Sequence, residues 1–364
     1  MYIIDMNYPV KAVIAATGSY IPTVKMSNEA FADHHFYDRN GLPLLQEQAV
    51  ILEKFKSISG ICERRYAQPD QQASDLGFLA ASNALDSSGI DPESLDYIIV
   101  AHNFGDVAFG SNRVSMVPSL ASRIKALLQI RNPSCVAYDL AFGCPGWLEG
   151  VIQASYYIRS GDARRCMVIG TETLSRVTDA HDRDCMLFGD GSGAVILEAA
   201  DDHRGGILAH CTQTHAHEYA HLLSMQPSNA PLQADSQDIF MKMNGRKLYE
   251  FALTTVPVAI KATLDKAGVP LSAINKVLIH QANEKMDAAI LQRLFKLYDM
   301  PMPADDLMPM TISWLGNSSV ATIPTLLDLI LKGNFDNHQI HPGDNIVFAS
   351  VGAGMNVNAM VYQF

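Results

Sequence analysis

The sequence lacks any uninterrupted apolar stretch of about 20 residues, because charged residues break every hydrophobic run well short of a membrane span. Its first residues, Met1–Asp5, have neither the basic region nor the apolar run of a secretory signal peptide. A membrane-spanning or secreted protein is therefore not expected. We predict a soluble, cytoplasmic protein with no membrane partner.

Positive charge is also scarce, since 27 Lys and Arg stand against 38 Asp and Glu, for a net charge of −11. Such a chain repels a phosphate backbone, so nucleic acid is not an expected partner. Paired-cysteine motifs are missing, because no CxxC occurs among Cys62, Cys135, Cys144, Cys166, Cys185 and Cys211. Reduced thiols are expected, and any one of them can serve as a nucleophile.

What the chain does contain is enough apolar sequence, 48% of 364 residues, for two domains or one large duplicated unit. Apolar runs that read as buried strands alternate with longer helical patterns, which predicts an α/β fold. These runs are residues 97–101, 165–169, 276–279 and 346–350.

The two halves of the sequence resemble each other. The matched segments are residues 94–103 with 272–283, and residues 138–161 with 310–333. The first pair leads into an apolar strand that ends at a histidine, and the second shares a turn, a helix-like stretch and a closing basic-Gly. With the two turns aligned, Gly143-Cys144 on Gly316-Asn317, Cys144 and Asn317 are equivalent. Two such halves should bring their corresponding loops to a shared centre.

The segment around Cys144 reads as a strand, a tight turn at 143–146 and a helix that runs to about Ser160. Pro145 suits a first helical turn. The sulfur is then at a helix N-terminus, where the dipole favours a nucleophilic thiolate. The alternative is a small buried cysteine that fills a strand-to-helix corner.

Two other polar residues follow similar turns. His280 ends a predicted strand, with Asn283 at the start of the next helix, and Asn317 lies in the turn equivalent to that of Cys144. Taken singly, a histidine placed like His280 is more often structural than catalytic, and the two asparagines read as caps or turn residues. Together, Cys144, His280 and Asn317 form a candidate catalytic set.

The combined pattern resembles the ketoacyl-acyl-carrier-protein synthase III family of the thiolase superfamily. The segments that carry it, in family order, are DLAFGCPGW (139–147), FGDGSGAVIL (188–197), MNGRKLYEFA (243–252), IHQAN (279–283), WLGNSSVATIP (314–324) and VGAGMN (351–356). The resemblance implies an α/β thiolase-like fold: two pseudo-symmetric halves with mixed sheets packed in layers around buried helices. We expect an N-terminal half over 1–200, with an enlarged 30–56 insertion, and a C-terminal half over 201–364.

The resemblance also assigns roles. It makes Cys144 the acyl acceptor, with His280 and Asn317 as its catalytic partners. The amides of Cys144 and Ala353 are the implied oxyanion hole, in a substrate-binding turn with Gly352 and Gly354; the family usually has glycine where this chain has Ala353. No cofactor or metal is implied, because acyl-coenzyme A or an acyl-carrier phosphopantetheine thioester is a substrate.

For substrate delivery, Arg183 matches a nucleotide-binding arginine of the family. The family's tryptophan and second arginine for coenzyme A fall on about Lys54 and Ile58, which makes a carrier-bound primer more plausible. An acyl carrier protein is the implied partner, through a basic patch of Arg246, Lys247 and Lys285, and a homodimer is the implied assembly.

The implied function is acyl transfer to Cys144 followed by decarboxylative Claisen condensation with a malonyl-type carrier thioester, in fatty acid or related biosynthesis. One alternative is a secondary-metabolite ketoacyl-coupling enzyme of the dialkylresorcinol type. A thioester hydrolase and a catalytically silent carrier-binding partner are further alternatives, although silent partners typically lose the cysteine.

Three other features have simpler interpretations. The histidine-rich stretch (His210, Cys211, His215, His217, His221) is expected to be a solvated loop rather than a metal site. The glycine-rich segment 188–193 is expected to be a turn between strands, since a helix does not follow it. Glu172, after a predicted strand, is expected to be structural rather than catalytic.

Overall fold

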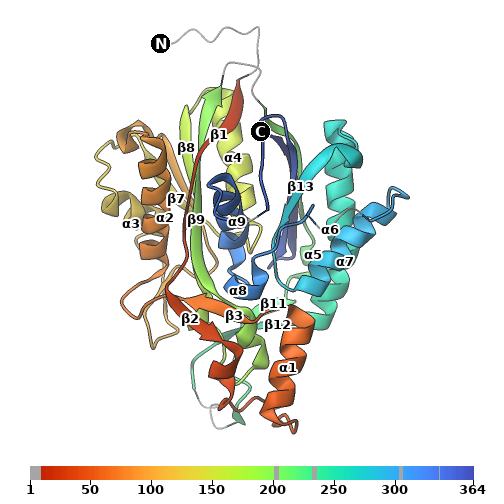
Figure 1. Cartoon of the computed structure of the whole chain (residues 1–364). Helices are drawn as coiled ribbons and strands as arrows, with labels where there is room; N and C mark the ends of the chain where they lie inside the picture. The colour runs from red at the N-terminus through yellow and green to blue at the C-terminus, as the bar shows by residue number, and fades with distance from the viewer. Residues whose placement is uncertain (1–9, 201–204, 232–235, 303–305, 336) are drawn as a thin grey trace.

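The computed structural model describes residues 10–200, 205–231, 236–302, 306–335 and 337–364. The segment Met1–Asp5, considered above for targeting signals, lies outside these residues. Two sheets stand side by side with helices between them and on their outer faces (Figure 1). Within the described part of the chain, no helix is both long and apolar enough to cross a membrane.

The first sheet has five strands in the order β1-β9-β8-β4-β7. Parallel pairing joins β4 to β7 and β8, and antiparallel pairing joins β9 to β8 and β1. Both β4 and β8 are buried almost throughout, as expected for strands covered on both faces. The strands are β1 (Lys11–Tyr20), β4 (Tyr97–Ala101), β7 (Val136–Leu140), β8 (Arg165–Thr173) and β9 (Asp190–Ala200).

The second sheet repeats this order and these directions with β10-β15-β14-β13. Where the first sheet has β7, the second has the segment at Leu307, whose carbonyl accepts a hydrogen bond from the Val277 N–H at 2.8 Å. Its strands are β10 (Gly206–Thr214), β13 (Ile274–Ile279), β14 (Asn345–Gly352) and β15 (Asn356–Gln363). The four predicted apolar strands and the α/β class are confirmed.

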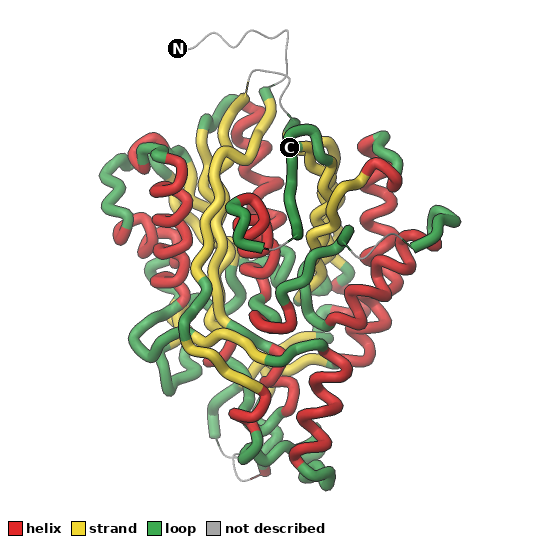
Figure 2. The backbone as a smooth tube through the Cα atoms, viewed as in Figure 1, coloured by secondary structure: helices red, strands yellow, loops and turns green. Residues whose placement is uncertain are grey.

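Two helices, α4 (Gly146–Ser160) and α9 (Thr322–Leu331), lie between the sheets (Figure 2). They share one apolar core with both sheets, in which Trp147 of α4 and Leu326 of α9 are buried. A helix buried on nearly every side is mostly apolar, and the buried Asp328 of α9 is paired, because it accepts from the Thr17 hydroxyl at 2.8 Å and lies 2.8 Å from the Lys332 ammonium. The layered arrangement expected from the duplicated sequence is therefore present.

Amphipathic helices cover the outer faces. The first sheet is covered by α2 (Ala73–Ser88) and α3 (Leu120–Leu127), and the second by α6 (Gly245–Ala267) and α7 (Glu284–Lys296). Each of these helices contributes buried side chains toward its sheet and exposed ones toward solvent.

The remaining elements are short and lie mostly at one end of the sheets. The helices are α1 (Gln48–Ser59), α5 (Ala216–Tyr219) and α8 (Ile312–Leu315), with 3-10 turns η1 (Asn28–Phe31), η2 (Pro92–Ser94), η3 (Leu174–Arg176), η4 (Arg183–Leu187), η6 (Leu271–Ala273) and η7 (Ser319–Ala321). The paired strands are β2 (Val24–Ser27) with β3 (Glu63–Tyr66), β5 (Asp106–Val107) with β6 (Val114–Ser115), and β11 (Leu223–Gln226) with β12 (Phe240–Met243).

Two local predictions were wrong. The glycines of segment 188–193 do not form a turn, because Asp190 already begins β9. At Gly193 a side chain has no room because α9 crosses the strand closely: a Cβ on Gly193 would lie 2.7 Å from Pro324 Cβ. The histidine-rich stretch is not a loop either, since His210 and Cys211 lie in β10. The Nε2 of His210 lies 3.1 Å from the Tyr156 hydroxyl.

The segment 30–56 wraps one end of the molecule and reaches the second sheet's half. The Tyr37 N–H donates to the His181 carbonyl at 2.9 Å, and the Arg39 guanidinium donates to the Met243 carbonyl of β12. Because β12 belongs to the hairpin described below, this segment supports one wall of the pocket from outside.

Candidate active site

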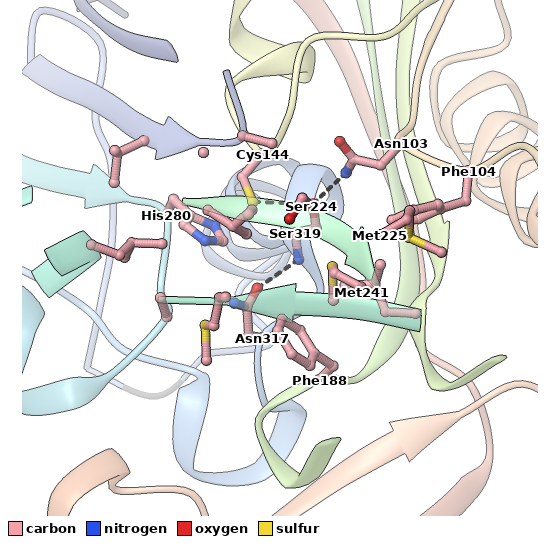
Figure 3. Close-up of a pocket in the computed structure, with 18 of the residues that line it drawn as sticks. Asn103, Phe104, Cys144, Phe188, Ser224, Met225, Met241, His280, Asn317 and Ser319 are labelled. Carbon is pink, nitrogen blue, oxygen red and sulfur yellow. Dashed lines mark hydrogen bonds between the residues drawn. The ribbon is translucent and has the colours of Figure 1, made fainter. Parts of the chain in front are cut away.

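A cavity of about 240 Å³ lies where the two halves meet, and it contains Cys144, His280 and Asn317. These three side chains point into it from different elements (Figure 3). Apart from a few polar groups, the lining is apolar. The three residues that the sequence singled out are therefore brought together in one pocket, which is the geometry a shared chemical task requires.

Cys144 lies where the sequence predicted, two residues before the helix α4, which is followed by the capping residue Gly161 with a φ of 82°. Its predicted thiolate character is wrong for the resting structure. Burial raises the pKa of the Cys144 thiol to about 12, opposed by the hydrogen bond that the Ser319 hydroxyl donates to its sulfur at 3.3 Å. The part of Cys144 that is exposed faces the enclosed pocket, so desolvation outweighs the helix terminus.

His280 follows β13, and its backbone N–H donates to the Ala349 carbonyl at 2.9 Å. The ring is buried, and its Nδ1 has no hydrogen-bond partner among the described residues. Burial lowers the pKa of His280 to about 4, against the opposing effect of a hydrogen bond to the Ser319 backbone. The imidazole is therefore neutral near pH 7, with one donor and one acceptor nitrogen.

Asn317 is held by its own backbone. Its N–H donates to the Leu187 carbonyl at 2.8 Å, and its carbonyl accepts from the Gly189 N–H at 2.9 Å. The side-chain Oδ1 accepts from the Ser319 N–H at 2.9 Å. Because Oδ1 is occupied, the Nδ2 amide is the end available to the pocket, as a donor. Asn283, by contrast, is a helix cap whose side chain accepts from the Met286 N–H.

The glycine-rich turn after β14 packs directly on the Cys144 turn. A Cβ on Gly352 would lie 2.4 Å from the Cys144 nitrogen, and a Cβ on Gly143 would lie 2.7 Å from the Ala353 nitrogen. No side chain fits at either glycine. The close approach brings the amides of Cys144 and Ala353 to the same edge of the pocket, and Gly354, at φ 124°, completes the turn.

The apolar wall comes largely from the β11–β12 hairpin. Leu223 pairs with Met243 and Met225 pairs with Met241 across the two strands. Because alternate residues share one face of a strand, all four side chains line the pocket. Phe104, Leu174, Phe188, Leu248 and Met286 complete the apolar surface.

The residues predicted for substrate delivery lie outside the pocket. Arg183 is exposed at the start of η4, and it does not line the cavity. Lys54 and Ile58 are exposed on α1. Arg246 and Lys247 of α6 and Lys285 of α7 are also exposed. These last three are adjacent in sequence to the pocket residues Leu248 and Met286.

Sequence reasoning missed two polar residues near the sulfur and gave a third no role in the site. Asn103 and Ser319 line the pocket, and Glu172 is buried behind Asn103. Only the internal repeat held a signal for Asn103, because it follows the histidine that corresponds to His280. Glu172 was expected to be structural, and its contacts are taken up below.

A two-sheet α/β fold with cysteine, histidine and asparagine in one pocket between its halves defines a thiolase-fold condensing enzyme. The sequence profile of 3-oxoacyl-[acyl-carrier-protein] synthase III matches residues 138–216, and the profile of its C-terminal part matches residues 264–364.

Solved structures agree with these matches. The chain is similar to 3-oxoacyl-[acyl-carrier-protein] synthase III from Aquifex aeolicus VF5, with 27% identity over 98% of this chain and 100% of that one, and a TM-score of 0.78. The Thermus thermophilus synthase III gives 28% identity over 96% and 98%, with a TM-score of 0.79. The Pseudomonas aeruginosa PAO1 synthase III gives 28% over 97% and 98%, with a TM-score of 0.78.

The chain belongs to the 3-oxoacyl-[acyl-carrier-protein] synthase III family. It is accordingly an acyltransferase of the kind that forms carbon–carbon bonds.

Proposed function

We propose that this enzyme transfers an acyl group to Cys144 and condenses it with a malonyl-type carrier thioester, in fatty acid or related biosynthesis. The observation that carries the proposal is the convergence of Cys144, His280 and Asn317 on one mainly apolar pocket. Family membership supports the reaction class, and the geometry supports the roles of the individual residues.

In the acylation step, the Cys144 sulfur attacks the thioester carbonyl and its proton passes to the neutral imidazole of His280. The amides of Cys144 and Ala353 stabilise the tetrahedral oxyanion. The carbon–sulfur bond to the carrier then breaks, and the departing thiolate takes the proton from His280. An acyl-enzyme with a neutral His280 remains. The raised pKa of the Cys144 thiol makes a proton acceptor in the pocket necessary.

In the condensation step, the malonyl-type thioester loses carbon dioxide, and the electron pair of the broken bond forms an enolate. Donors from His280 and the Nδ2 of Asn317 stabilise the enolate oxygen without adding negative charge. The enolate carbon then attacks the acyl carbonyl, the bond to the Cys144 sulfur breaks, and the released thiolate takes up a proton from solvent to restore the thiol. The low pKa of His280 leaves its imidazole neutral at the start of each step.

The walls of the pocket indicate the class of acyl group. Leu223 and three methionines, Met225, Met241 and Met243, form an apolar surface, and the methionines are unbranched and adaptable. A charged or strongly polar acyl group would lose its hydration there without new partners. We therefore propose an apolar acyl chain as the group that Cys144 carries.

An acyl carrier protein is the proposed carrier. Its recognition is assigned to Arg246, Lys247 and Lys285, which are exposed beside pocket residues at the first turns of α6 and α7.

We also propose a homodimer formed through β7, the edge strand of the first sheet. Because the Val136 N–H bonds inward to the Asp96 carbonyl at 2.8 Å, the Ala137 N–H faces outward. Ala137→Pro should therefore shift the dimer toward monomer in sedimentation equilibrium.

A second candidate is a secondary-metabolite ketoacyl-coupling enzyme. It is favoured by the segment 30–56, whose Arg39 contacts Met243 of the pocket wall, and by the exposed Ile58 where the family places a phosphate-binding arginine. Both features concern substrate choice. Neither changes the roles assigned to Cys144, His280 and Asn317.

The test is intact-protein mass spectrometry after exposure to a panel of acyl-coenzyme A and acyl-carrier thioesters, with and without a malonyl thioester. We expect a single acyl adduct that Cys144→Ala lacks and that the malonyl thioester discharges as a ketoacyl product. An adduct retained by Cys144→Ala would exclude Cys144 as the site. Discharge as free acid, without malonyl thioester, would indicate a hydrolase. A discharged diketone-type product from ketoacyl substrates would favour the second candidate.

A further inference from the structure

A chain of hydrogen bonds leads from the Cys144 sulfur to a carboxyl group that does not line the pocket. The Ser319 hydroxyl donates to the sulfur at 3.3 Å, and the Asn103 Nδ2 donates to the Ser319 hydroxyl oxygen at 3.0 Å. The same Asn103 Nδ2 also donates to Glu172 Oε1 at 2.5 Å. Figure 3 shows the Asn103–Ser319–Cys144 part of this chain.

The direction of these bonds is set at Glu172. Two donors of Asn103, its backbone N–H at 2.7 Å and its Nδ2, converge on the single oxygen Oε1. An oxygen that receives two N–H groups acts as an acceptor, so the amide must present its nitrogen, not its oxygen. Asn103 is thereby prevented from flipping.

The orientation of the Asn103 amide decides what the Ser319 hydroxyl does. While Nδ2 donates to the Ser319 oxygen, the hydroxyl hydrogen is free to point at the Cys144 sulfur. If the amide flipped, its Oδ1 would accept that hydrogen, and the sulfur would lose a donor. A donor on the sulfur stabilises the developing thiolate, and this hydrogen bond does lower the pKa of the Cys144 thiol against the larger effect of burial.

We propose that Glu172 is a positioning residue that, by fixing the Asn103 amide, directs the Ser319 hydroxyl hydrogen at the Cys144 sulfur. The inference rests on the proposed function, because it takes Cys144 to be the nucleophile. It goes further by placing a buried carboxyl group of β8 and two polar residues from different halves in the activation of the sulfur.

The role requires an acceptor at Glu172, not a negative charge. Burial raises the pKa of Glu172 to about 7, opposed by His102 and by the Asn103 hydrogen bonds, while Asp190 adds to the rise. The Oε1 atom accepts from Asn103 whether or not the other oxygen carries a proton. The charge itself has the opposite effect, since ionised Glu172 raises the pKa of the thiol. Neutral His280 is the other titratable group in the pocket.

Two variants distinguish the acceptor role of Glu172 from the effect of its negative charge. Glu172→Gln keeps an oxygen acceptor and removes the charge, whereas Glu172→Ala removes both. The readout is the rate of Cys144 alkylation by iodoacetamide as a function of pH, followed by peptide mass spectrometry. Cys62 is exposed and serves as an internal reference in the same samples. Glu198→Ala, which removes a carboxylate from the neighbouring strand β9, is the matched control.

We expect Glu172→Ala to slow Cys144 alkylation near neutral pH by about tenfold relative to Cys62, with the pH profile shifted about one unit upward. Glu172→Gln should alkylate at least as fast as the parent protein. Equal profiles for the parent and both variants would overturn the inference, as would equal loss in both. Neither result affects the proposed function, which depends on the loss of the acyl adduct in Cys144→Ala.

A second route is open if Glu172→Ala fails to fold. Ser319 has a φ of 54°, which glycine adopts without strain, so Ser319→Gly removes the hydroxyl while keeping the backbone. It should slow Cys144 alkylation as Glu172→Ala does. In the double variant Asn103→Asp with Glu172→Gln, an amide at position 172 donates to a carboxylate at position 103. The hydrogen bond between the two positions is thus kept, but its direction is reversed. The double variant should therefore fold and yet alkylate slowly; alkylation at the parent rate would contradict the proposed polarity.

Discussion

Two histidines occupy equivalent places in the two halves, and only one of them faces the pocket. His102 follows β4, and His280 follows β13. Each ring nitrogen of His102 has a close polar neighbour: its Nε2 lies 3.0 Å from Asp139 Oδ2, and its Nδ1 accepts from the Gly105 N–H at 3.0 Å. His280 has an unpartnered Nδ1 within the described structure and lines the cavity.

The difference traces to one position. The repeat aligns Gly143 with Gly316, and their φ values of 68° and 66° agree with that register. In the same register, Asp139 corresponds to Ile312. The first half therefore supplies a carboxylate to its histidine, whereas the corresponding residue of the second half is apolar. In this duplicated fold, one histidine of the equivalent pair contacts a carboxylate and has a structural role, whereas the other is neutral and lines the pocket.

The largest effect should come from removing the donors of the second half. His280→Ala and Asn317→Ala should each slow condensation by on the order of 10²-fold or more, because each removes a donor from the enolate oxygen. Acylation should suffer less from Asn317→Ala, which leaves the proton acceptor in place. Single-turnover assays of adduct formation and of malonyl-dependent discharge separate the two steps. Condensation that survives the double variant would contradict these roles.

The matching change in the first half should act on stability. His102→Ala leaves Asp139 without its buried partner, so the free energy of unfolding should fall by on the order of 3 kcal/mol. Urea unfolding of His102→Ala and His280→Ala, compared side by side, measures the contrast. A larger stability loss in His280→Ala than in His102→Ala would break the comparison between the two halves.

The two halves also differ in a buried aspartate near an outer helix. Asp139 accepts from the Leu120 and Ala121 N–H groups at the start of α3. Asp287, in the first turn of α7, is buried with no described hydrogen-bond partner for either carboxyl oxygen, and burial raises its pKa well above the usual value. In the folded protein Asp287 therefore keeps its proton where the unfolded chain has lost it.

Stability should consequently decline as pH rises above about 3.9, the usual aspartate pKa, by up to about 1.4 kcal/mol per pH unit from Asp287 alone. Asp287→Asn should flatten this part of the decline. Urea unfolding at about pH 5 and about pH 8 provides the test. A parent protein and variant with the same pH slope would show that Asp287 ionises normally when folded.

The smallest expected effect is that of pH on the rate of condensation. Because the pKa of His280 lies at about 4, condensation by enzyme already acylated on Cys144 should vary little between about pH 8 and about pH 6. Single-turnover discharge at several pH values measures this. A step near pH 6.5 would mean that His280 titrates like a solvent-exposed histidine.

Much of the frame was predictable because its signals are local. The apolar runs at 97–101 and 276–279, the glycine stops at Gly161 and Gly333, and the internal repeat each follow from residue types in sequence order. The three polar residues of the site were found because the repeat and the family motifs coincide on them.

Other features depend on contacts that sequence order does not encode. The pKa of Cys144 is set by enclosure, which no residue near it in sequence reveals. The strand character of 190–193 follows from the crossing of α9, and the pocket wall at Met225 follows from the pairing of β11 with β12. Glu172 shows its relation to the sulfur only through Asn103 and Ser319.

The interlocked glycines at 143 and 352 have a consequence for how the enzyme comes into being. The sulfur lies on a segment translated early, whereas the amide of Ala353, the Asn317 side chain and the Ser319 hydroxyl belong to segments translated much later. A half-made chain thus holds the thiol without the surroundings that let it accept an acyl group. The oxyanion hole and the hydrogen-bond donor to the sulfur are therefore complete only in the finished tertiary structure.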